Sequence, residues 1–279
     1  MSAITVAYQG EPGAYSELAA LNHFGASCEP TGFTDFDQVF EAVTNGRCDF
    51  GCVPVENTLG GSIHRNYDLL MRHALHCVGE VVVPIRWFMY ALPGTELGDV
   101  QRVISHWQTL AQCERSLDRL LPGITRKDVY DNAGAVKMLI EQNLVDHAAI
   151  AGARAGQIYK LPVIASGLED DPSNATRFVI LSRSAAANEL IPGEVYKTSI
   201  VFALHNVPGA LHKAMAAFAL RDIDLCKIES RPLQGSPFEY LFYIDLIGHI
   251  AQPHFARALA NLQEYTTIYR NLGSFARAR

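Results

Sequence analysis

Short apolar runs alternate with stretches of helical spacing through the first 180 residues, and this alternation constrains the fold more than any other feature. Residues 50–55 (FGCVPV) and 147–152 (HAAIAG) have the composition of buried strands. Residues 35–46 have the pattern of a helix that Asp35 caps and Gly46 ends. Strands separated by helices pair mostly in parallel, so we expect an α/β fold.

The strand-rich run 78–94 is too long for one strand, and Pro84 is expected to break it where the chain crosses between two lobes. A second α/β series follows this run. We therefore expect two small lobes with a cleft between them. The first lobe comprises about residues 1–83 and 165–184, and the second about residues 84–164.

The composition changes after residue 184, where a small, polar and Pro/Gly-bearing stretch at 185–196 is expected to be a linker. Residues 197–279 then follow a strand–helix–strand–strand–helix–strand order. This βαββαβ pattern is typical of a ferredoxin-like domain. The chain is thus expected to hold one domain at 1–184 and a different one at 197–279.

Composition argues against several classes of protein. The 279 residues carry a net charge of −6, which does not favour a nucleic-acid partner. No apolar run is long enough for a membrane span and no secretory signal is apparent, so we expect a cytoplasmic protein. The six cysteines form no C-x-x-C pair, and no metal site is expected. The first glycine-rich turn lacks the dinucleotide and P-loop patterns.

Polar residues follow a buried strand in the segment 53–63 (VPVENTLGGSI). Ligands of α/β folds bind beyond the carboxyl ends of strands, where Glu56 and Asn57 are expected to lie. We expect the two glycines that follow to open a helix at Ser62, so that backbone N–H groups can face an anion.

Two further segments place polar residues at the ends of expected strands. Ser105 and His106 follow one strand, and Gln112 lies in the helix after it. In 174–181 (NATRFVIL), alternation places Thr176 and Phe178 on one strand face and Arg177 on the other. Unless Arg177 lies at the very end of the strand, we expect it to be structural, for example by pairing with an acidic residue of 169–171.

Four segments of this chain, taken together, resemble the prephenate dehydratase family over nearly all 279 residues. They are YQGEPGAYS (8–16), VPVENTLGGSIHRNYDLL (53–70), ISHWQTLAQC (104–113) and SNATRFVIL (173–181). The C-terminal region, with NVPGAL (206–211) and KIESRP (227–232), resembles the regulatory ACT domain of this family. The segment 60–70 looks especially like the branch that includes plant arogenate dehydratases.

The resemblance implies a two-lobed, periplasmic-binding-protein-like catalytic domain at 1–184 and an ACT domain at 197–279. It implies a hydro-lyase that converts prephenate to phenylpyruvate, with loss of water and CO2, in L-phenylalanine biosynthesis. No metal or organic cofactor is implied. Phenylalanine is the implied effector, and ACT domains are implied to pair the chain into a dimer or tetramer. Arogenate dehydratase activity is the alternative, and a non-catalytic small-molecule sensor is less favoured.

The resemblance also implies site residues. The implied catalytic residues are Thr176, Glu56, Asn57, Gln112 and Ser105. The implied substrate-binding residues are Thr58, Gly60, Gly61, Ser62, Asn132, Arg177 and Phe178. The implied phenylalanine-binding residues are Asn206, Gly209, Ala210, Leu211, Glu229, Ser230, Arg231 and Pro232. Trp107 and Asn132 depart from the family pattern, which usually has proline and threonine there.

The source of the proton stays open at this point. Thr176 matches the favoured donor to the leaving hydroxyl, but a threonine hydroxyl is a weak acid, and a partly buried Glu56 is a competitor. A cation on the departing ring carboxylate would oppose its loss. An anchor is therefore expected on the side-chain carboxylate, from backbone N–H groups at 60–62 or from Arg177.

Overall fold

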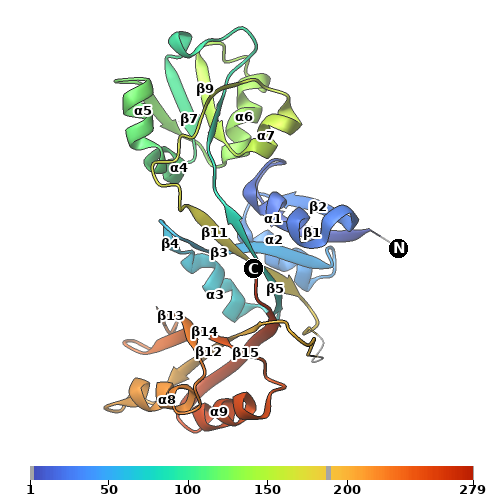
Figure 1. The fold of residues 1–279 in the computed structure, drawn as a ribbon, viewed down its shortest axis with the longest axis vertical. Coiled ribbons are helices and arrows are strands. Elements are labelled where there is room, and N and C mark those ends of the chain that lie inside the picture. The colour runs from blue at the N-terminus through green and yellow to red at the C-terminus, as the bar shows by residue number, and fades with distance from the viewer. Residues whose placement is uncertain (1–2, 187–189, 279) are drawn as a thin grey trace. The chain divides into compact units, whose positions relative to one another are not determined.

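The computed structural model describes residues 3–186 and 190–278, whose strands form three sheets flanked by helices (Figure 1). The first sheet contains β1 (Ile4–Gln9), β2 (Cys28–Phe33), β3 (Phe50–Asn57), β4 (Gly61–Ser62), β5 (His76–Pro84) and β11 (Ala175–Ser182). The second contains β6 (Phe88–Tyr90), β7 (Arg102–Ser105), β8 (Thr125–Asp128), β9 (His147–Ala151) and β10 (Val163–Ser166). The third contains β12 (Tyr196–Leu204), β13 (Leu225–Pro232), β14 (Tyr240–Ile247) and β15 (Thr266–Ala276).

The first sheet has the order β2-β1-β3-β11-β5, with β4 paired to β3. β1 pairs in parallel with β2 and β3, whereas β3 and β4 are antiparallel. Between its strands the chain forms α1 (Tyr15–Phe24), α2 (Phe36–Thr44) and α3 (His64–Arg72). The predicted cap of α2 is confirmed, because the Asp35 carboxylate accepts from the N–H of Gln38 at 2.9 Å. The sequence did not lead us to expect β2, whose Pro30 and Gly32 disfavour a strand.

The second sheet has the order β10-β6-β9-β7-β8 and is mixed, with β7 parallel to β8 and β9 but β6 antiparallel to β9. Side-chain alternation divides its two apolar faces. Val103 and Ile150 pack with α4 (Trp107–Gln112) and α5 (Glu114–Leu120). Ile104 and Ala149 pack with α6 (Asn132–Glu141) and α7 (Ala153–Tyr159). Figure 1 shows these two helix pairs on opposite sides of β7 and β9.

The chain passes from the first sheet to the second after Pro84, where the sequence predicted a crossing. The return falls slightly later than expected, because the strand Val163–Ser166 pairs with β6 in the second sheet. The two crossing segments are hydrogen-bonded to each other. The N–H of Ile85 donates to the carbonyl of Asn174 at 2.8 Å, and the N–H of Trp87 donates to the Glu169 carboxylate at 3.0 Å.

The third sheet has the order β13-β14-β12-β15, and with α8 (Ala210–Ala219) and α9 (Pro253–Gln263) it follows the predicted βαββαβ order. Ile244 of β14 packs in the cluster that includes both helices. Its neighbour Tyr243 has the opposite direction, and its hydroxyl donates to the carbonyl of Tyr67 in α3 at 2.9 Å. Figure 1 shows α8 and α9 on one side of this sheet and α3 on the other.

Contacts divide the chain into two compact units, and the division differs from the expected boundary near residue 184. One unit contains the residues up to Ile63 and Val81–Phe178, and the other contains His64–Glu80 and Val179–Arg279. The second unit includes α3 because the third sheet holds that helix tightly. The Arg270 guanidinium donates to the carbonyls that end α3, including that of Leu70 at 2.7 Å. Lys197 pairs with the buried Glu80 at 2.7 Å.

Part of the expected linker at 185–196 lies outside the described residues, which omit 187–189. In the ranges that the structure does describe, no helix combines the length and apolar character that a membrane crossing needs.

Gly273 of β15 lies so close to β5 that no side chain fits, because a Cβ there would be 2.0 Å from the carbonyl oxygen of Cys77. Its φ of +148° also disfavours any other residue. We expect Gly273→Ala to lower the free energy of unfolding by about 3 kcal/mol or more, measured by urea denaturation. Gly235→Ala, at φ +85° with open space around it, is the control and should cost about 1–2 kcal/mol. Equal losses would contradict the close-contact explanation.

Candidate functional site

The side chains of Asn57 and Thr176 meet where the end of β3 lies beside the start of β11. The Oδ1 atom of Asn57 accepts from the N–H groups of Leu59 at 3.0 Å and Gly60 at 2.7 Å. Because a backbone N–H can only donate, these bonds fix which end of the amide is the oxygen. The Nδ2 atom therefore faces the other way and donates to Thr176 Oγ1 at 3.0 Å.

This contact leaves the hydroxyl hydrogen of Thr176 available. The residue is 9% exposed, and its oxygen is already an acceptor. In residues 3–186 and 190–278, nothing accepts a hydrogen bond from Thr176 Oγ1. Asn57, in contrast, also donates to the carbonyl of Ala175 at 3.0 Å, so both ends of its amide are occupied. The pair thus presents one hydroxyl donor, which Asn57 orients.

Glu56 and Arg177 lie on the opposite faces of the same two strands. Arg177 Nε is 3.4 Å from Glu56 Oε2, and the Arg177 side chain is 12% exposed. The expected pairing of Arg177 with residues 169–171 is wrong, since Glu169 contacts Arg86 instead. Phe178 shares the face of Thr176, as alternation predicted, and is buried in the core at 2% exposure. The structure therefore separates Glu56 from Thr176 and joins it to Arg177.

The glycines after Thr58 form a tight hairpin and do not open a helix. Gly61–Ser62 is a short strand that pairs back onto Glu56 and Asn57, and α3 begins only at His64. The expected helix start at Ser62 is wrong, because the backbone of Gly61 and Ser62 is paired with β3 and so does not take part in a helix. The N–H of Gly60 is also occupied by Asn57 Oδ1.

Thr58 connects the same hairpin to the start of β11. Its hydroxyl donates to the carbonyl of Ser173 at 3.1 Å and accepts from the N–H of Ala175 at 3.0 Å. Its own N–H donates to the carbonyl of Ala175 at 2.9 Å. All three groups of this expected substrate-binding residue are therefore used to hold the strands together.

Gln112 ends α4 and is joined to the Asn57–Thr176 pair through Asn174. Gln112 Oε1 accepts from Asn174 Nδ2 at 2.8 Å and from the indole N–H of Trp87 at 3.2 Å. Asn174 Oδ1 in turn accepts from Asn57 Nδ2 at 2.8 Å. Asn174 is 1% exposed and was not among the residues that sequence reasoning selected. It stands in the family-like segment 173–181, but nothing in its residue type distinguishes it from an ordinary loop asparagine.

Ser105 and Asn132 lie together at the end of β7. The Ser105 hydroxyl has two carbonyl acceptors, Asn132 Oδ1 at 2.8 Å and the backbone oxygen of Ile150 at 2.7 Å. Asn132 Oδ1 also accepts from the N–H of His106 at 3.1 Å and from the hydroxyl of Thr109 at 2.9 Å. Ser105 thus positions Asn132. The Nδ2 atom of Asn132 has no hydrogen-bond partner in the part of the chain that the structure describes.

His106 and Trp107 form the start of α4. His106 is its N-cap, and Nδ1 of the ring accepts from the N–H of Gln108 at 3.4 Å. Burial lowers the pKa of His106, against an opposing effect of Asp128, so the ring keeps this acceptor. Trp107 is 60% exposed and occupies the first helical position, where proline is favoured in general. No group of three or more His, Cys, Asp or Glu side chains among the described residues is arranged to hold a metal.

The residues expected to bind phenylalanine fall into two separate groups. Asn206 and Gly209 lie in the turn between β12 and α8, with Gly209 at φ +75°, and Ala210 and Leu211 begin α8. Glu229, Ser230, Arg231 and Pro232 lie on β13. β13 is not next to β12, because β14 lies between them in the sheet. This is the ferredoxin-like order, in which the third strand lies between the first two.

Two of the β13 residues contact α3. Arg231 donates two hydrogen bonds to the Asp68 carboxylate, at 3.2 and 2.9 Å. Glu229 lies 3.1 Å from His64 Nε2. α3 follows the hairpin that begins at Asn57, so these pairs join the C-terminal sheet to a helix close in sequence to the candidate site.

Sequence reasoning also missed polar contacts between elements of the first and second sheets. Glu17 of α1 is 5% exposed and receives two hydrogen bonds from Arg154 of α7, at 2.9 and 2.8 Å. Glu11 accepts from the hydroxyl of Tyr130 at 2.7 Å. Burial raises the pKa of Asp131 to about 6. No local pattern marks these residues, because each partner lies more than 100 positions away.

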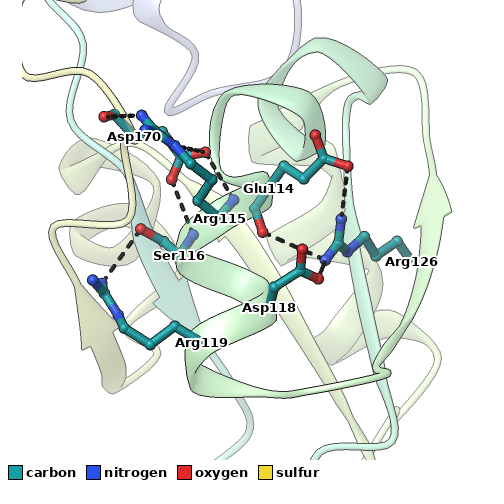
Figure 2. Close-up of polar contacts among 7 residues, drawn as sticks. All are labelled: Glu114, Arg115, Ser116, Asp118, Arg119, Arg126 and Asp170. Carbon is teal, nitrogen blue, oxygen red and sulfur yellow. Dashed lines mark hydrogen bonds and ion pairs between the residues drawn. The ribbon is translucent and has the colours of Figure 1, made fainter.

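Figure 2 shows how Asp170 lies against the first turn of α5. Its carboxylate accepts from the N–H groups of Arg115 at 2.9 Å and Ser116 at 3.0 Å. Its own N–H donates to the carbonyl of Gln112 at 2.9 Å. Asp170 therefore satisfies donors that the helix start leaves open, and it fixes the segment before β11 beside Gln112.

Comparisons with known proteins identify a family. The model of the prephenate dehydratase family matches residues 6–186. The chloroplastic "arogenate dehydratase/prephenate dehydratase 2" of Arabidopsis thaliana is 47% identical, over 98% of this chain and 73% of that protein.

Two solved structures are similar over most of their length. Prephenate dehydratase from Arthrobacter aurescens in complex with L-Phe has a TM-score of 0.89 and 32% identity, covering 98% of this chain and 90% of that one. A protein described as a novel type of quorum quenching acylase has a TM-score of 0.88 and 32% identity, covering 98% and 97%.

The Asp170 contacts predict a difference between two carboxylates at α5: that of Asp170, which caps the helix from outside, and that of Asp118, which is part of it. Asp170→Ala should lower the free energy of unfolding by about 1–2 kcal/mol, since it leaves two helix N–H groups without an acceptor. Asp118, which pairs with Arg126 on the exposed side of the helix, is the control (Figure 2). Asp118→Ala should cost less than about 1 kcal/mol in the same urea titration. The reverse order would show that α5 does not depend on Asp170.

Proposed function

The chain belongs to the prephenate dehydratase family and is a dehydratase of L-phenylalanine biosynthesis, and we propose that it converts prephenate to phenylpyruvate. One observation carries the proposal. Asn57 donates to Thr176 Oγ1 at 3.0 Å, which leaves a buried hydroxyl hydrogen to meet the leaving hydroxyl of the substrate. The expected two-lobed arrangement, with the cleft at these residues, is part of this proposal.

The reaction needs one proton and no external electrons. The bond from the ring to its hydroxyl breaks as that oxygen gains a proton and leaves as water. The bond between the ring and its carboxylate also breaks. The carboxylate leaves as CO2, and the electron pair of that bond stays with the ring and makes it aromatic. Thr176 hydrogen-bonds the leaving oxygen, and exact placement of that donor lowers the barrier.

Three of the expected site residues, Thr176, Gln112 and Asn132, offer hydrogens of uncharged groups, a hydroxyl and two amides. A fixed cation would stabilise the departing carboxylate in the ground state and slow its loss. Arg177, the cation nearest in sequence, contacts Glu56 on the other side of the strands. This contact favours a structural role for the Glu56–Arg177 pair and Thr176 as the direct partner of the substrate.

Arogenate is the second candidate substrate, and the name of the Arabidopsis relative supports it as much as prephenate. The two substrates differ only in the side chain, where arogenate carries an amine in place of the keto group. The ratio of kcat/KM for the two purified substrates decides between them.

The acylase description of one similar structure is not favoured by this site. An acylase that used Thr176 as its nucleophile would need a base to accept the hydroxyl proton. The contact at Thr176 Oγ1 comes instead from Asn57 Nδ2, which is a donor.

For regulation, we propose that residues 197–279 form an ACT domain that binds phenylalanine where two copies of the chain meet. The L-Phe complex of the Arthrobacter relative supports the ligand. β14 separates β12, which leads into the turn before α8, from β13, and this separation favours a site in which the two groups of expected ligand residues come from different chains of a pair. The pairing would give a dimer, or a tetramer built from two dimers. Residues 1–184 would be the catalytic domain.

The contact of Arg231 with Asp68 is the proposed route from effector to site. Asp68→Asn weakens this charged pair, so the phenylalanine concentration for half-maximal effect should change by about threefold or more. The value of kcat/KM without phenylalanine should stay within about twofold of wild type. Glu41→Gln, on the exposed side of α2, is the matched control. An unchanged phenylalanine response in Asp68→Asn would remove α3 from the route.

Turnover by Thr176 variants tests the function itself. Thr176→Ala removes the hydroxyl and should lower kcat by about 10²–10³-fold on the preferred substrate, whereas Thr176→Ser should retain more activity. Glu56→Gln should keep the acid limb of the pH–rate profile, because Glu56 lies on the other face of the sheet. Full turnover by Thr176→Ala would require another proton donor, and a lost acid limb in Glu56→Gln would restore Glu56 to that role.

A further inference from the structure

Three side chains, Asn57, Asn174 and Gln112, form a continuous hydrogen-bonded row whose two ends are fixed by groups that can only donate. At one end, the N–H groups of Leu59 and Gly60 bind Asn57 Oδ1. At the other end, the indole N–H of Trp87 binds Gln112 Oε1 at 3.2 Å. A carboxamide oxygen accepts and its nitrogen donates, so each end determines the orientation of the amide it contacts.

Asn174 is the middle member of this row and satisfies both neighbours at once. Its Oδ1 accepts from Asn57 Nδ2 at 2.8 Å, and its Nδ2 donates to Gln112 Oε1 at 2.8 Å. The residue is 1% exposed, so water does not replace either bond easily. A side chain of this size at this position must therefore carry one donor and one acceptor, which an asparagine does and an aspartate does not.

The orientation of Gln112 has a consequence for a ligand. With Oε1 occupied twice, the Nε2 group faces away from the row, and it has no partner within residues 3–186 and 190–278. Gln112 thus presents hydrogens, as Thr176 does. A substrate that carries a hydroxyl and two carboxylates offers the acceptors that such donors need.

We propose that Asn174 is a positioning residue that sets Gln112 as a hydrogen-bond donor to the substrate and aligns it with the Thr176 hydroxyl. The inference rests on the proposed dehydratase function. Asn174 does not touch the reacting atoms, and its effect on turnover passes through Gln112, since Leu59 and Gly60 hold Asn57 independently. Trp87 supports the same orientation from the far side of Gln112.

A double-mutant cycle tests this dependence. Asn174→Ala should lower kcat/KM by about 30–100-fold in the wild-type background but by less than about threefold in the Gln112→Ala background, because the residue it positions is then absent. Ser173→Ala, one position earlier and with its hydroxyl donated to Asp171, is the control and should stay within about twofold of wild type. Losses that multiply in the double variant would overturn the proposal.

Gln112→Glu tests the hydrogen-bond donor of Gln112 without disturbing the contacts that hold its side chain. One oxygen of the new carboxylate keeps both bonds, to Asn174 and Trp87, while the other replaces the free NH2 group by an acceptor. Its kcat/KM should fall by about 10²-fold at pH 7 and recover, relative to wild type, as pH falls toward the usual glutamic acid pKa of about 4.3. Wild-type activity at pH 7 would show that the substrate does not need the donor.

The outcome is distinguishable from failure of the proposed function. Turnover of prephenate or arogenate by the wild-type chain tests that function directly. If neither is turned over, the function fails, and urea midpoints of the same four proteins still test the link. The double variant Asn174→Ala/Gln112→Ala should then have a urea midpoint no lower than that of the less stable single variant. Additive shifts would show that Asn174 and Gln112 are independent.

Discussion

The candidate site depends on the two backbone N–H groups that hold the oxygen of Asn57. Leu59 and Gly60 lie in a hairpin that folds back onto β3, so their donors are fixed by the chain itself. That orientation sends Asn57 Nδ2 toward β11, where it meets Asn174 and Thr176. The orientations of the Asn174 and Gln112 amides, which continue the row, are consistent with this orientation of Asn57. A backbone feature of one hairpin thus determines which hydrogens the site offers.

The architecture could largely be predicted from the sequence, because it follows from local patterns. Periodicity predicted the α/β alternation, the break at Pro84 and the βαββαβ order, and Asp35 caps α2 as expected. β2 was missed because Pro30 and Gly32 are poor strand residues, and this strand lies at the edge of its sheet. The paired glycines at 60–61 fit a helix start and a hairpin equally well. Only the pairing with β3 distinguishes the two.

For the site, the sequence could predict some of the residues but not how they contact one another. Family resemblance named Thr176, Asn57 and Gln112, and the structure links them through one hydrogen-bonded row. Asn174 was not predicted, because its role depends on Asn57 and Gln112, which lie 117 and 62 positions away, and no local pattern encodes such contacts. The two faces of β11 explain why Glu56 joined Arg177 and not Thr176. The separation of β13 from β12 likewise required the strand order, which propensities do not contain.

The distance along the chain between Asn57 and Thr176 has a consequence for how the protein is made. Their hydrogen bond closes a loop of 119 residues, and the whole second sheet lies within that loop. Closing so long a loop is slow unless the intervening residues are already compact. During synthesis, β3 and its hairpin leave the ribosome long before β11 is translated. The nascent chain therefore contains Asn57 without Thr176, and their hydrogen bond can form only after the whole second sheet has been synthesised.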